Sequence, residues 1–184
     1  MGLKICYHVT KGGAVLNIRK LTTLSLFSAI ALTIFMIEAQ IPALVPIPGI
    51  KLGLANIITV YVVYALGSKE GSAVLFVRVF LGAIFSGQFS TIFYSAAGGL
   101  LAILATIFLK RFLQDNQIWV AGCIGAIAHS VGQMIVAVWV TGTPALLIYL
   151  PVLILCSVFA GTFTGLCAQL ILKRGKKLWK IIFK

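Results

Sequence analysis

Long apolar stretches separated by short polar segments occupy most of the chain. A helix crosses the hydrocarbon core of a bilayer in about 20 apolar residues, and six stretches have this character: 21–37, 52–66, 72–87, 89–109, 118–140 and 145–172. The second and third stretches are short and are joined by the polar turn 67–71. Almost no polar loop separates the third from the fourth, so two tilted helices or a tight outer hairpin would fit there. We predict six membrane-spanning helices, with five or seven as the alternatives.

The composition leads to the same fold class, an all-α integral membrane protein. Of the 184 residues, 61% are hydrophobic and only 10% are charged, whereas soluble domains have about 25% charged residues. So few charges cannot cover a water-exposed surface of this size. The length fits one domain, which we divide into a basic cytoplasmic leader (1–20), a six-helix transmembrane domain (21–172) and a basic cytoplasmic tail (173–184).

The positive charge is distributed unevenly along the chain. The net charge is +12, but the bases lie between apolar runs and do not form one basic face, so we expect no nucleic-acid binding. In a six-span arrangement, every Lys and Arg except Lys51 and Arg78 falls on the side of the membrane that holds both termini. Cytoplasmic loops carry an excess of Lys and Arg, so we expect both termini in the cytoplasm.

Small residues recur at four-residue spacing within the spans, which places them on one face of each helix. Such faces let two helix backbones approach closely in lipid. The repeats are Gly122, Ala126 and Ser130; Ser157, Gly161 and Gly165; Ala160, Thr164 and Ala168; and Gly98 and Ala102. Ser25 and Ala29 have the same relation in the first span, where this face would either pack internally or meet another membrane protein.

Polar residues inside the spans are where a site is expected, because burying polar groups in lipid is costly. Arg78 is the clearest of them, since it lies well inside the third span. It would face the bundle interior and hold an anionic or carbonyl-bearing group, or reach back to the interface, or pair with Glu38. Of the three acidic residues, Glu38 is the one that the topology places near the outer half of the bundle.

A second group of polar residues lies in the neighbouring spans. His129 and Gln133 are four residues apart and therefore share a helix face. Together with Asn56 and Gln88 they would line a binding cavity, or they would form interhelical hydrogen bonds that only hold the bundle together. Tyr94 is the best aromatic candidate for a ligand contact.

The residues needed for most enzyme chemistry are missing from the sequence. The three acidic residues, Glu38, Glu70 and Asp115, lie in different loops, so the chain has neither paired carboxylates for acid–base work nor an aspartate-rich Mg²⁺ site for a diphosphate. No glycine-rich phosphate loop occurs, and the four cysteines show no metal-binding or disulfide spacing. We therefore expect no catalytic residues, no metal site and no enzyme activity in this chain alone.

Three segments together resemble the signature of a bacterial membrane family. They are Pro-Ile-Pro-Gly-Ile-Lys-Leu-Gly-Leu-Ala-Asn at 46–56, the stretch 78–82 running on to Tyr-Ser-Ala-Ala-Gly-Gly at 94–99, and Ala-His-Ser-Val-Gly-Gln at 128–133. The family is catalogued as the Gx transporter family and also as heptaprenyl diphosphate synthase component I. It often has Asn where this chain has Ser130, which weakens a polar role for that position. The resemblance extends over about 21–172, nearly the whole apolar region.

The resemblance implies an architecture, because the family is similar to the substrate-binding S components of energy-coupling factor (ECF) vitamin transporters. Those are six-helix bundles of the bacterial cytoplasmic membrane with cytoplasmic termini and a long first outer loop over the binding site. A small-residue face on their first helix meets an energy-coupling transmembrane subunit that works with ATPases, and Ser25 and Ala29 would form that face here. The corresponding lid residues of the outer loop would be Pro46, Pro48, Gly49 and Lys51.

Two main functions stay open from the sequence and the resemblance. In the first, the chain binds and translocates a small, largely apolar or aromatic molecule. Its ligand residues would be Asn56, Arg78, Gln88, Tyr94, His129 and Gln133. In the second, it is the membrane component of a quinone- and flavin-linked extracellular electron-transfer pathway beside a flavin-bearing extracytoplasmic protein, with Arg78 and His129 on the quinone head group.

A third reading is an accessory subunit of prenyl diphosphate or menaquinone synthesis, which requires a soluble catalytic partner on the basic cytoplasmic face. The synthase name fits the sequence badly, because the aspartates that such chemistry needs are missing. No resident cofactor is identified in any of the three readings, although a quinone or flavin would serve as the bound ligand in the second.

Overall fold

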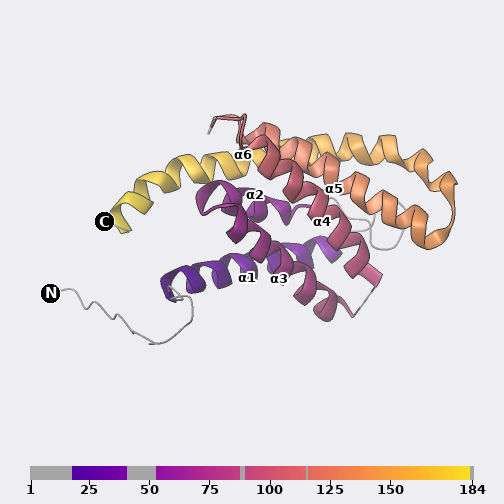
Figure 1. Ribbon diagram of the computed structural model, residues 1–184, viewed down its shortest axis with the longest axis horizontal. Helices are drawn as coiled ribbons and strands as arrows, with labels where there is room; N and C mark the ends of the chain where they lie inside the picture. The colour runs from indigo at the N-terminus through magenta and orange to yellow at the C-terminus, as the bar shows by residue number, and fades with distance from the viewer. Residues whose placement is uncertain (1–17, 41–52, 88–89, 115, 183–184) are drawn as a thin grey trace.

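The computed structural model describes residues 18–40, 53–87, 90–114 and 116–182, and every regular element in these ranges is helical. The predicted all-α class is therefore confirmed for the described chain. The elements in order are α1 (Ile18–Gln40), α2 (Asn56–Ala65), α3 (Ser68–Ser86), α4 (Ser90–Leu109), α5 (Ile118–Thr141), the short 3₁₀ helix η1 (Pro144–Tyr149) and α6 (Leu150–Ile182) (Figure 1). The six α-helices correspond one to one to the six predicted stretches.

Four of these helical segments are long and apolar enough to cross a membrane. They are Lys20–Gln40, Ile92–Leu109, Ile118–Thr141 and the combined η1–α6 segment Pro144–Gly175. Helix α2 has only 10 residues, and α3 carries Lys69, Glu70 and Arg78 among its 19. Large apolar side chains are exposed on the outside of the bundle, where they face lipid; Phe76, Phe159 and Phe163 are examples. The chain is therefore a multi-pass membrane protein.

The short helix α2 lies at the centre of the arrangement and contacts each of the other five α-helices. Most of its residues are buried. Around it, α4, α5 and α6 pack in sequence, while α1 packs on α3 (Figure 1). A short helix can occupy the centre because its apolar side chains, such as Val62 and Val63, are buried on all sides.

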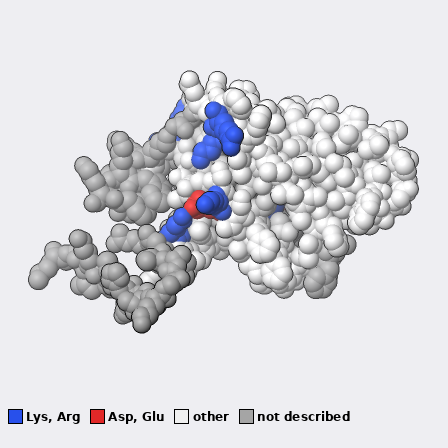
Figure 2. Space-filling view, in the orientation of Figure 1, with Lys and Arg blue, Asp and Glu red and all other residues white. Residues whose placement is uncertain are grey.

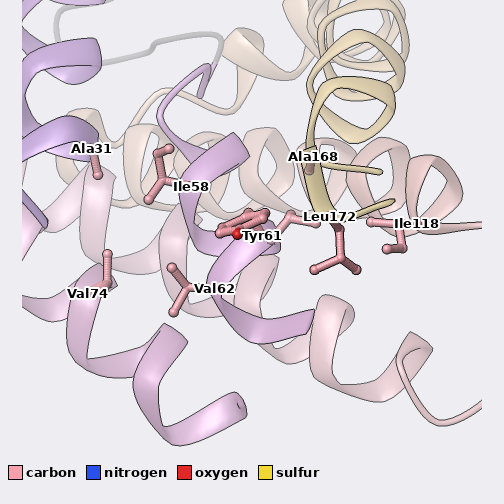
Figure 3. Packing of buried hydrophobic residues seen from close by; sticks show 9 residues of the cluster. Ala31, Ile58, Tyr61, Val62, Val74, Ile118, Ala168 and Leu172 are labelled. Atoms are coloured by element: carbon pink, nitrogen blue, oxygen red, sulfur yellow. The ribbon is translucent and has the colours of Figure 1, made fainter. Parts of the chain in front are cut away.

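The main apolar core joins α2 to four of its neighbours, α1, α3, α5 and α6. Figure 3 shows Tyr61 of α2 beside Leu172 of α6, with Ile58 and Val62 on the same central helix. The Tyr61 ring also packs on Phe27 of α1, with ring centroids 5.3 Å apart. The remaining members of this cluster are Ala31, Val60, Val74, Ile118 and Ala168.

The small-residue repeats of α5 and α6 pack against each other, as their spacing predicts. A Cβ added at Gly122 would lie 2.5 Å from the Cα of Gly165, and one added at Gly161 would lie 2.6 Å from the Cβ of Ala126. At the end of the same seam, the hydroxyl oxygens of Ser130 and Ser157 are 2.5 Å apart. The two backbones are therefore too close for larger side chains.

Helix α3 ends at Ser86, between the third and fourth predicted stretches, where the sequence alone left the break uncertain. Gly87 caps α3 in the left-handed region, with φ +65°, which glycine adopts without steric cost. The tail predicted at 173–184 does not begin a new element, because α6 continues helically to Ile182.

Charged side chains gather at one end of the molecule, which we call the basic end. Figure 2 shows blue and red atoms mainly over the end where α1 begins and α6 finishes. Lys20 forms an ion pair with Glu70 there, and the Lys110 ammonium donates a hydrogen bond to the Val63 carbonyl oxygen at 2.5 Å. The predicted cytoplasmic location of the termini corresponds to this end and stays a prediction.

Candidate functional site

Three polar residues lie at similar depth inside the bundle. Asn56 begins α2, which runs 10 residues toward the basic end, so at 1.5 Å per residue it lies about 15 Å from that end. Arg78 in α3 and His129 in α5 are each about three turns from the ends of their helices on the same side. This depth is about half of a hydrocarbon core of roughly 30 Å.

Local sequence explains why α2 begins so deep. Gly53 adopts φ +77°, a conformation that favours glycine, and its carbonyl oxygen accepts a hydrogen bond from the Asn56 N–H at 2.9 Å. The chain therefore makes a tight turn at 53–56 and enters the helix inside the bundle. The turn exposes the Asn56 side chain to α5 instead of to water.

Arg78 is buried, with 2% of its surface exposed, so its guanidinium stays within the bundle and does not reach back to the interface. Its Cζ lies 5.9 Å from the centroid of the Phe35 ring on α1. One turn further along α1, the buried Glu38 exerts an attractive charge interaction on Arg78. Arg78 thus faces the interior of the bundle, which is one of the alternatives that the sequence allowed. The oppositely charged Glu38 lies on the neighbouring helix α1.

Glu38 also fixes the turn that precedes α2. Its carboxylate Oε1 accepts a hydrogen bond from the Gly53 N–H at 2.5 Å. Hydrogen bonds to a charged acceptor are stronger than those between neutral groups. The carboxylate therefore ties the end of α1 to the start of α2 beside the guanidinium of α3.

His129 fits between two glycines. A Cβ added at Gly53 would lie 3.1 Å from His129 Cδ2 and 3.2 Å from the Asn56 Nδ2, and one added at Gly98 of α4 would lie 2.9 Å from His129 Nδ1. The imidazole and the Asn56 amide therefore both pack closely against Gly53. Bulkier residues at either glycine would push the imidazole away.

Several polar atoms of this cluster have no hydrogen-bond partner among the described residues. They are both side-chain atoms of Asn56, the Thr59 hydroxyl, Nε of Arg78 and Nδ1 of His129. All four residues are more than nine-tenths buried. Buried polar groups are nearly always paired, and an unsatisfied one costs about 1–3 kcal/mol. The arrangement is therefore suited to a ligand that supplies the missing partners.

The structure brings together some of the predicted ligand residues. Asn56 and His129 both pack against Gly53, and Arg78 contacts Phe35, one turn before the Glu38 that bonds the Gly53 N–H. Gln133 lies buried one turn from His129 on α5. Tyr94 is buried in a separate apolar cluster with Met134, Ala137 and Leu153. Gln88 and the predicted lid residues, which are Pro46, Pro48, Gly49 and Lys51, lie outside the described residues. The ligand role of every one of these residues stays a prediction.

Thr59 is the polar residue that the sequence reasoning missed. It follows Asn56 by three positions, a spacing that places both on one helix face, so the signal was present in the second stretch. Glu38 was considered only as a pairing partner for Arg78. Its hydrogen bond to Gly53 had no sequence signal, because it joins positions on either side of the outer loop.

The predicted partner face on α1 is exposed. Ser25 and Ala29 both lie on the outside of the described bundle, and the Ala29 carbonyl accepts a hydrogen bond from the Thr33 hydroxyl at 3.0 Å. Among the described residues, no group of three His, Cys, Asp or Glu side chains is placed to hold a metal ion. Docking of another membrane protein on α1 stays a prediction.

Comparison with known families gives one match. The family model described as heptaprenyl diphosphate synthase component I matches residues 27–171. This stretch contains Glu38, Asn56, Arg78 and His129, and it extends from α1 into α6. Comparisons with curated proteins and with solved structures found no significant match.

Proposed function

This chain is a multi-pass membrane protein of the heptaprenyl diphosphate synthase component I family, and we propose that it binds a small, largely apolar or aromatic molecule inside its helix bundle. In this proposal it acts as the substrate-binding and translocation subunit of a membrane transport system. The ligand would contact Asn56, Arg78 and His129.

One observation carries the proposal: at mid-depth in an otherwise apolar bundle, a group of buried polar atoms has no hydrogen-bond partner among the residues that the structure describes. Polar groups at this depth are costly and are usually functional. Secondary transporters place substrate sites near the bilayer midplane, at helices that are interrupted within the membrane. The start of α2 about halfway through the bundle supports the same kind of site.

A catalytic role is less well supported by the arrangement. Of the acidic residues within the described chain, Glu38 lies near the end of α1, where it bonds the Gly53 N–H, whereas Glu70 lies at the basic end in an ion pair with Lys20. The two carboxylates are thus too far apart to hold one Mg²⁺ ion, which is usually bound through carboxylates and substrate phosphates. We propose that the chain is not itself an enzyme, despite the name of its family.

Translocation needs a partner that moves or distorts the bundle, and two features support this part of the proposal. All six α-helices would contribute spans, with the outer loop of Pro46, Pro48, Gly49 and Lys51 as the lid. The exposed face of Ser25 and Ala29 on α1 offers small side chains against which another helix could pack closely. An energy-coupling transmembrane subunit with its ATPases is the proposed occupant.

Electron transfer is a second candidate function, and it is favoured by the hydrogen-bonding groups of Arg78 and His129. Arg78 Nε is a hydrogen-bond donor, and a neutral imidazole can also donate from one nitrogen. These groups suit the two carbonyl oxygens of a quinone head group. A flavin-bearing extracytoplasmic protein would then be the partner.

The test is to purify the full chain in a mild neutral detergent and to identify co-purifying small molecules by mass spectrometry. Asn56→Leu should lose the bound molecule, because it removes both an unsatisfied donor and an unsatisfied acceptor. The control is Thr106→Val, since the Thr106 hydroxyl is buried but bonded to the Ala102 carbonyl at 2.8 Å. A vitamin-like compound supports transport, and a quinone or flavin supports the second candidate. If no molecule is retained by the unmodified chain, the binding proposal fails.

A further inference from the structure

The lipid-facing side of α6 is one continuous apolar stripe. Its exposed large side chains recur at spacings of three and four residues, which place them on one face of the helix: Val152, Leu155, Phe159, Phe163, Leu166 and Leu170. Leu170 follows Val152 by 18 positions, which corresponds to a rise of about 27 Å in an α-helix. A hydrocarbon core is roughly 30 Å thick, so this stripe nearly spans the apolar part of the bilayer.

Positive charge begins where the stripe ends. Lys173 and Arg174 follow Leu170 by three and four positions, so they continue the same face of α6, and both side chains are exposed. They belong to the basic end, where Figure 2 shows the charged atoms gathered. Because the apolar stripe accounts for the thickness of the hydrocarbon core, these two bases lie at the depth of the lipid headgroups.

Helix α4 has the same arrangement. Its exposed large side chains share one face and are Phe93, Leu100, Leu104 and Phe108. The helical turn continues past the end of α4, where the Arg111 N–H donates a hydrogen bond to the Phe108 carbonyl oxygen at 3.2 Å. Arg111 is exposed and is followed by the exposed Phe112, whose ring centroid lies 5.1 Å from that of Phe108. A base therefore follows directly on the lipid-facing stripe of this helix too.

Helix α5 packs between α4 and α6 and begins at the same level. The Trp119 N–H donates a hydrogen bond to Oε1 of Gln169 on α6 at 3.5 Å, and a Cβ added at Gly165 would lie 2.7 Å from the Trp119 Cα. Trp119 thus lies about one turn before Lys173, and its side chain is 40% exposed. Tryptophan is enriched at membrane–water interfaces, so its position agrees with a headgroup level at these bases.

The chain has too few acidic side chains to neutralise this surface. Three Asp and Glu residues stand against 15 Lys and Arg residues in the whole sequence. Glu38 lies near the far end of α1, where it bonds the Gly53 N–H, and Glu70 pairs with Lys20. The third acid, Asp115, lies outside the described residues and can neutralise at most one base. At least two of the three bases on α4 and α6 therefore have no acidic side chain to pair with.

We propose that Arg111, Trp119, Lys173 and Arg174 form a surface that binds the anionic headgroups of membrane phospholipids. Basic residues at the membrane boundary attract anionic lipids, and the guanidinium group suits the oxygens of a phosphate. An acidic soluble protein would approach from the water beyond the end of the bundle, whereas these bases directly follow lipid-facing side chains. The headgroup surface lies on the outside of the bundle and does not depend on the ligand proposed for its interior.

The test compares two phospholipids that differ in headgroup charge. The purified full chain in a neutral detergent is titrated with phosphatidylglycerol or with phosphatidylcholine carrying the same acyl chains, and thermal unfolding is followed. Each base near an anionic surface strengthens the attraction about fivefold. We therefore expect phosphatidylglycerol to reach half of its stabilising effect at a concentration at least about tenfold lower than phosphatidylcholine. Equal effects of the two lipids overturn the proposal.

A triple variant assigns the effect to these bases. Arg111→Gln, Lys173→Gln and Arg174→Gln together should raise the concentration of phosphatidylglycerol needed by at least about tenfold and leave that of phosphatidylcholine unchanged. The control is Lys20→Gln with Glu70→Gln, which removes an ion pair at the same end without changing the net charge and should keep the preference. If the triple variant does not fold, Arg174→Gln alone should show a loss of about fivefold. A folded variant that keeps the full preference contradicts the assignment.

A soluble acidic peptide separates a lipid from a protein as the occupant. Hexaglutamate carries negative charges but no acyl chains, so at equal concentration of charge it should stabilise the protein much less than phosphatidylglycerol does. Equal stabilisation by hexaglutamate would assign the surface to an acidic protein partner and overturn the lipid proposal.

Discussion

The Gly53 N–H donates a hydrogen bond to the Glu38 carboxylate at 2.5 Å, which joins the end of α1 to the turn before α2. The same carboxylate compensates the charge of Arg78 on α3. Three helices that are separated along the chain therefore meet at one acidic side chain. The position of Asn56 at the start of α2 depends on this junction.

Substitution of Gly53 tests the junction. Gly53→Ala should destabilise the protein for two reasons: its φ of +77° strains any residue with a Cβ, and the new Cβ would lie 3.1 Å from His129 Cδ2. The backbone strain alone costs about 1–2 kcal/mol. Gly87→Ala is the matched control, because Gly87 has φ +65° and nothing within 4 Å of an added Cβ. Thermal unfolding in detergent should show a larger loss for Gly53→Ala, and equal losses would show that the His129 contact is unimportant.

Replacement of Asn56 should have opposite effects on the empty and the ligand-bound protein. In protein stripped of small molecules, Asn56→Leu should raise stability by about 1 kcal/mol, because it removes two buried polar atoms that have no hydrogen-bond partner within the described part of the chain. In protein that retains its ligand, the same variant should lose the ligand-induced stabilisation. Unfolding midpoints measured before and after extensive detergent exchange provide the comparison. A variant less stable than the unmodified chain in both states would mean that Asn56 has a partner in the folded protein.

The seam between α5 and α6 predicts strong sensitivity at one glycine. Gly122→Ala would place a Cβ 2.5 Å from Gly165 Cα, so the two backbones must separate. Overpacking of this kind costs about 1–3 kcal/mol. Gly125→Ala, one turn away on the same helix, would place a Cβ 3.1 Å from the Thr106 hydroxyl and 3.7 Å from the Ala102 carbonyl oxygen, and should be tolerated better. Expression and unfolding midpoints in detergent distinguish the two, and similar behaviour of both variants would contradict the close approach.

The ion pair at the basic end predicts a pH dependence. The hydrogen bond from Lys20 lowers the pKa of Glu70 below its ordinary value of 4.5. The pair therefore stabilises the folded chain above about pH 4.5, and this contribution is lost as the pH falls from there through the lowered folded pKa. The side chains of Lys20 and Glu70 are 52% and 14% exposed, so the contribution is about 0.2–1 kcal/mol.

Glu70→Gln is the variant that measures this contribution. Its unfolding midpoint should be slightly lower than that of the unmodified chain at pH 7, and the two should converge near pH 3. The difference should also shrink in high salt, which screens exposed charges. A difference in midpoint that stays constant across this pH range would show that the effect of Glu70→Gln does not come from the charge of the carboxylate.

The fold was predictable to the extent that it depends on local sequence. Helix positions followed from apolar length, and the close α5–α6 seam followed from glycines and serines at four-residue spacing, because both patterns act within one helix. We predicted six spans, and four helical segments of the described chain are long and apolar enough to cross a membrane. The other two predicted spans, α2 and α3, are helical but are not among these four. Their sequences cannot show that α2 is short because it begins inside the bundle.

The candidate site was predictable by residue type but not by arrangement. Asn56, Arg78 and His129 were recognised as polar residues in apolar stretches, and the structure places them together. Tyr94 was grouped with them by residue type and span position, whereas its ring packs in an apolar cluster with Met134 and Leu153. Which polar residues meet depends on helix rotation and on interhelical packing, and neither can be read from one helix alone.

The sequence by itself determined that this protein resides in a membrane, that its regular elements are helices throughout the described residues, and that most of its charges lie toward one end. These properties follow from the cost of placing charged and unpaired backbone groups in lipid, which acts on each stretch independently. Only the tertiary structure decided that Glu38 bonds the Gly53 N–H at the start of α2, and that the Asn56 amide packs against Gly53 beside His129 with no hydrogen-bond partner among the described residues. Those relationships join residues far apart in the chain, so they depend on the depth at which α2 begins and on the glycines that let its neighbours approach.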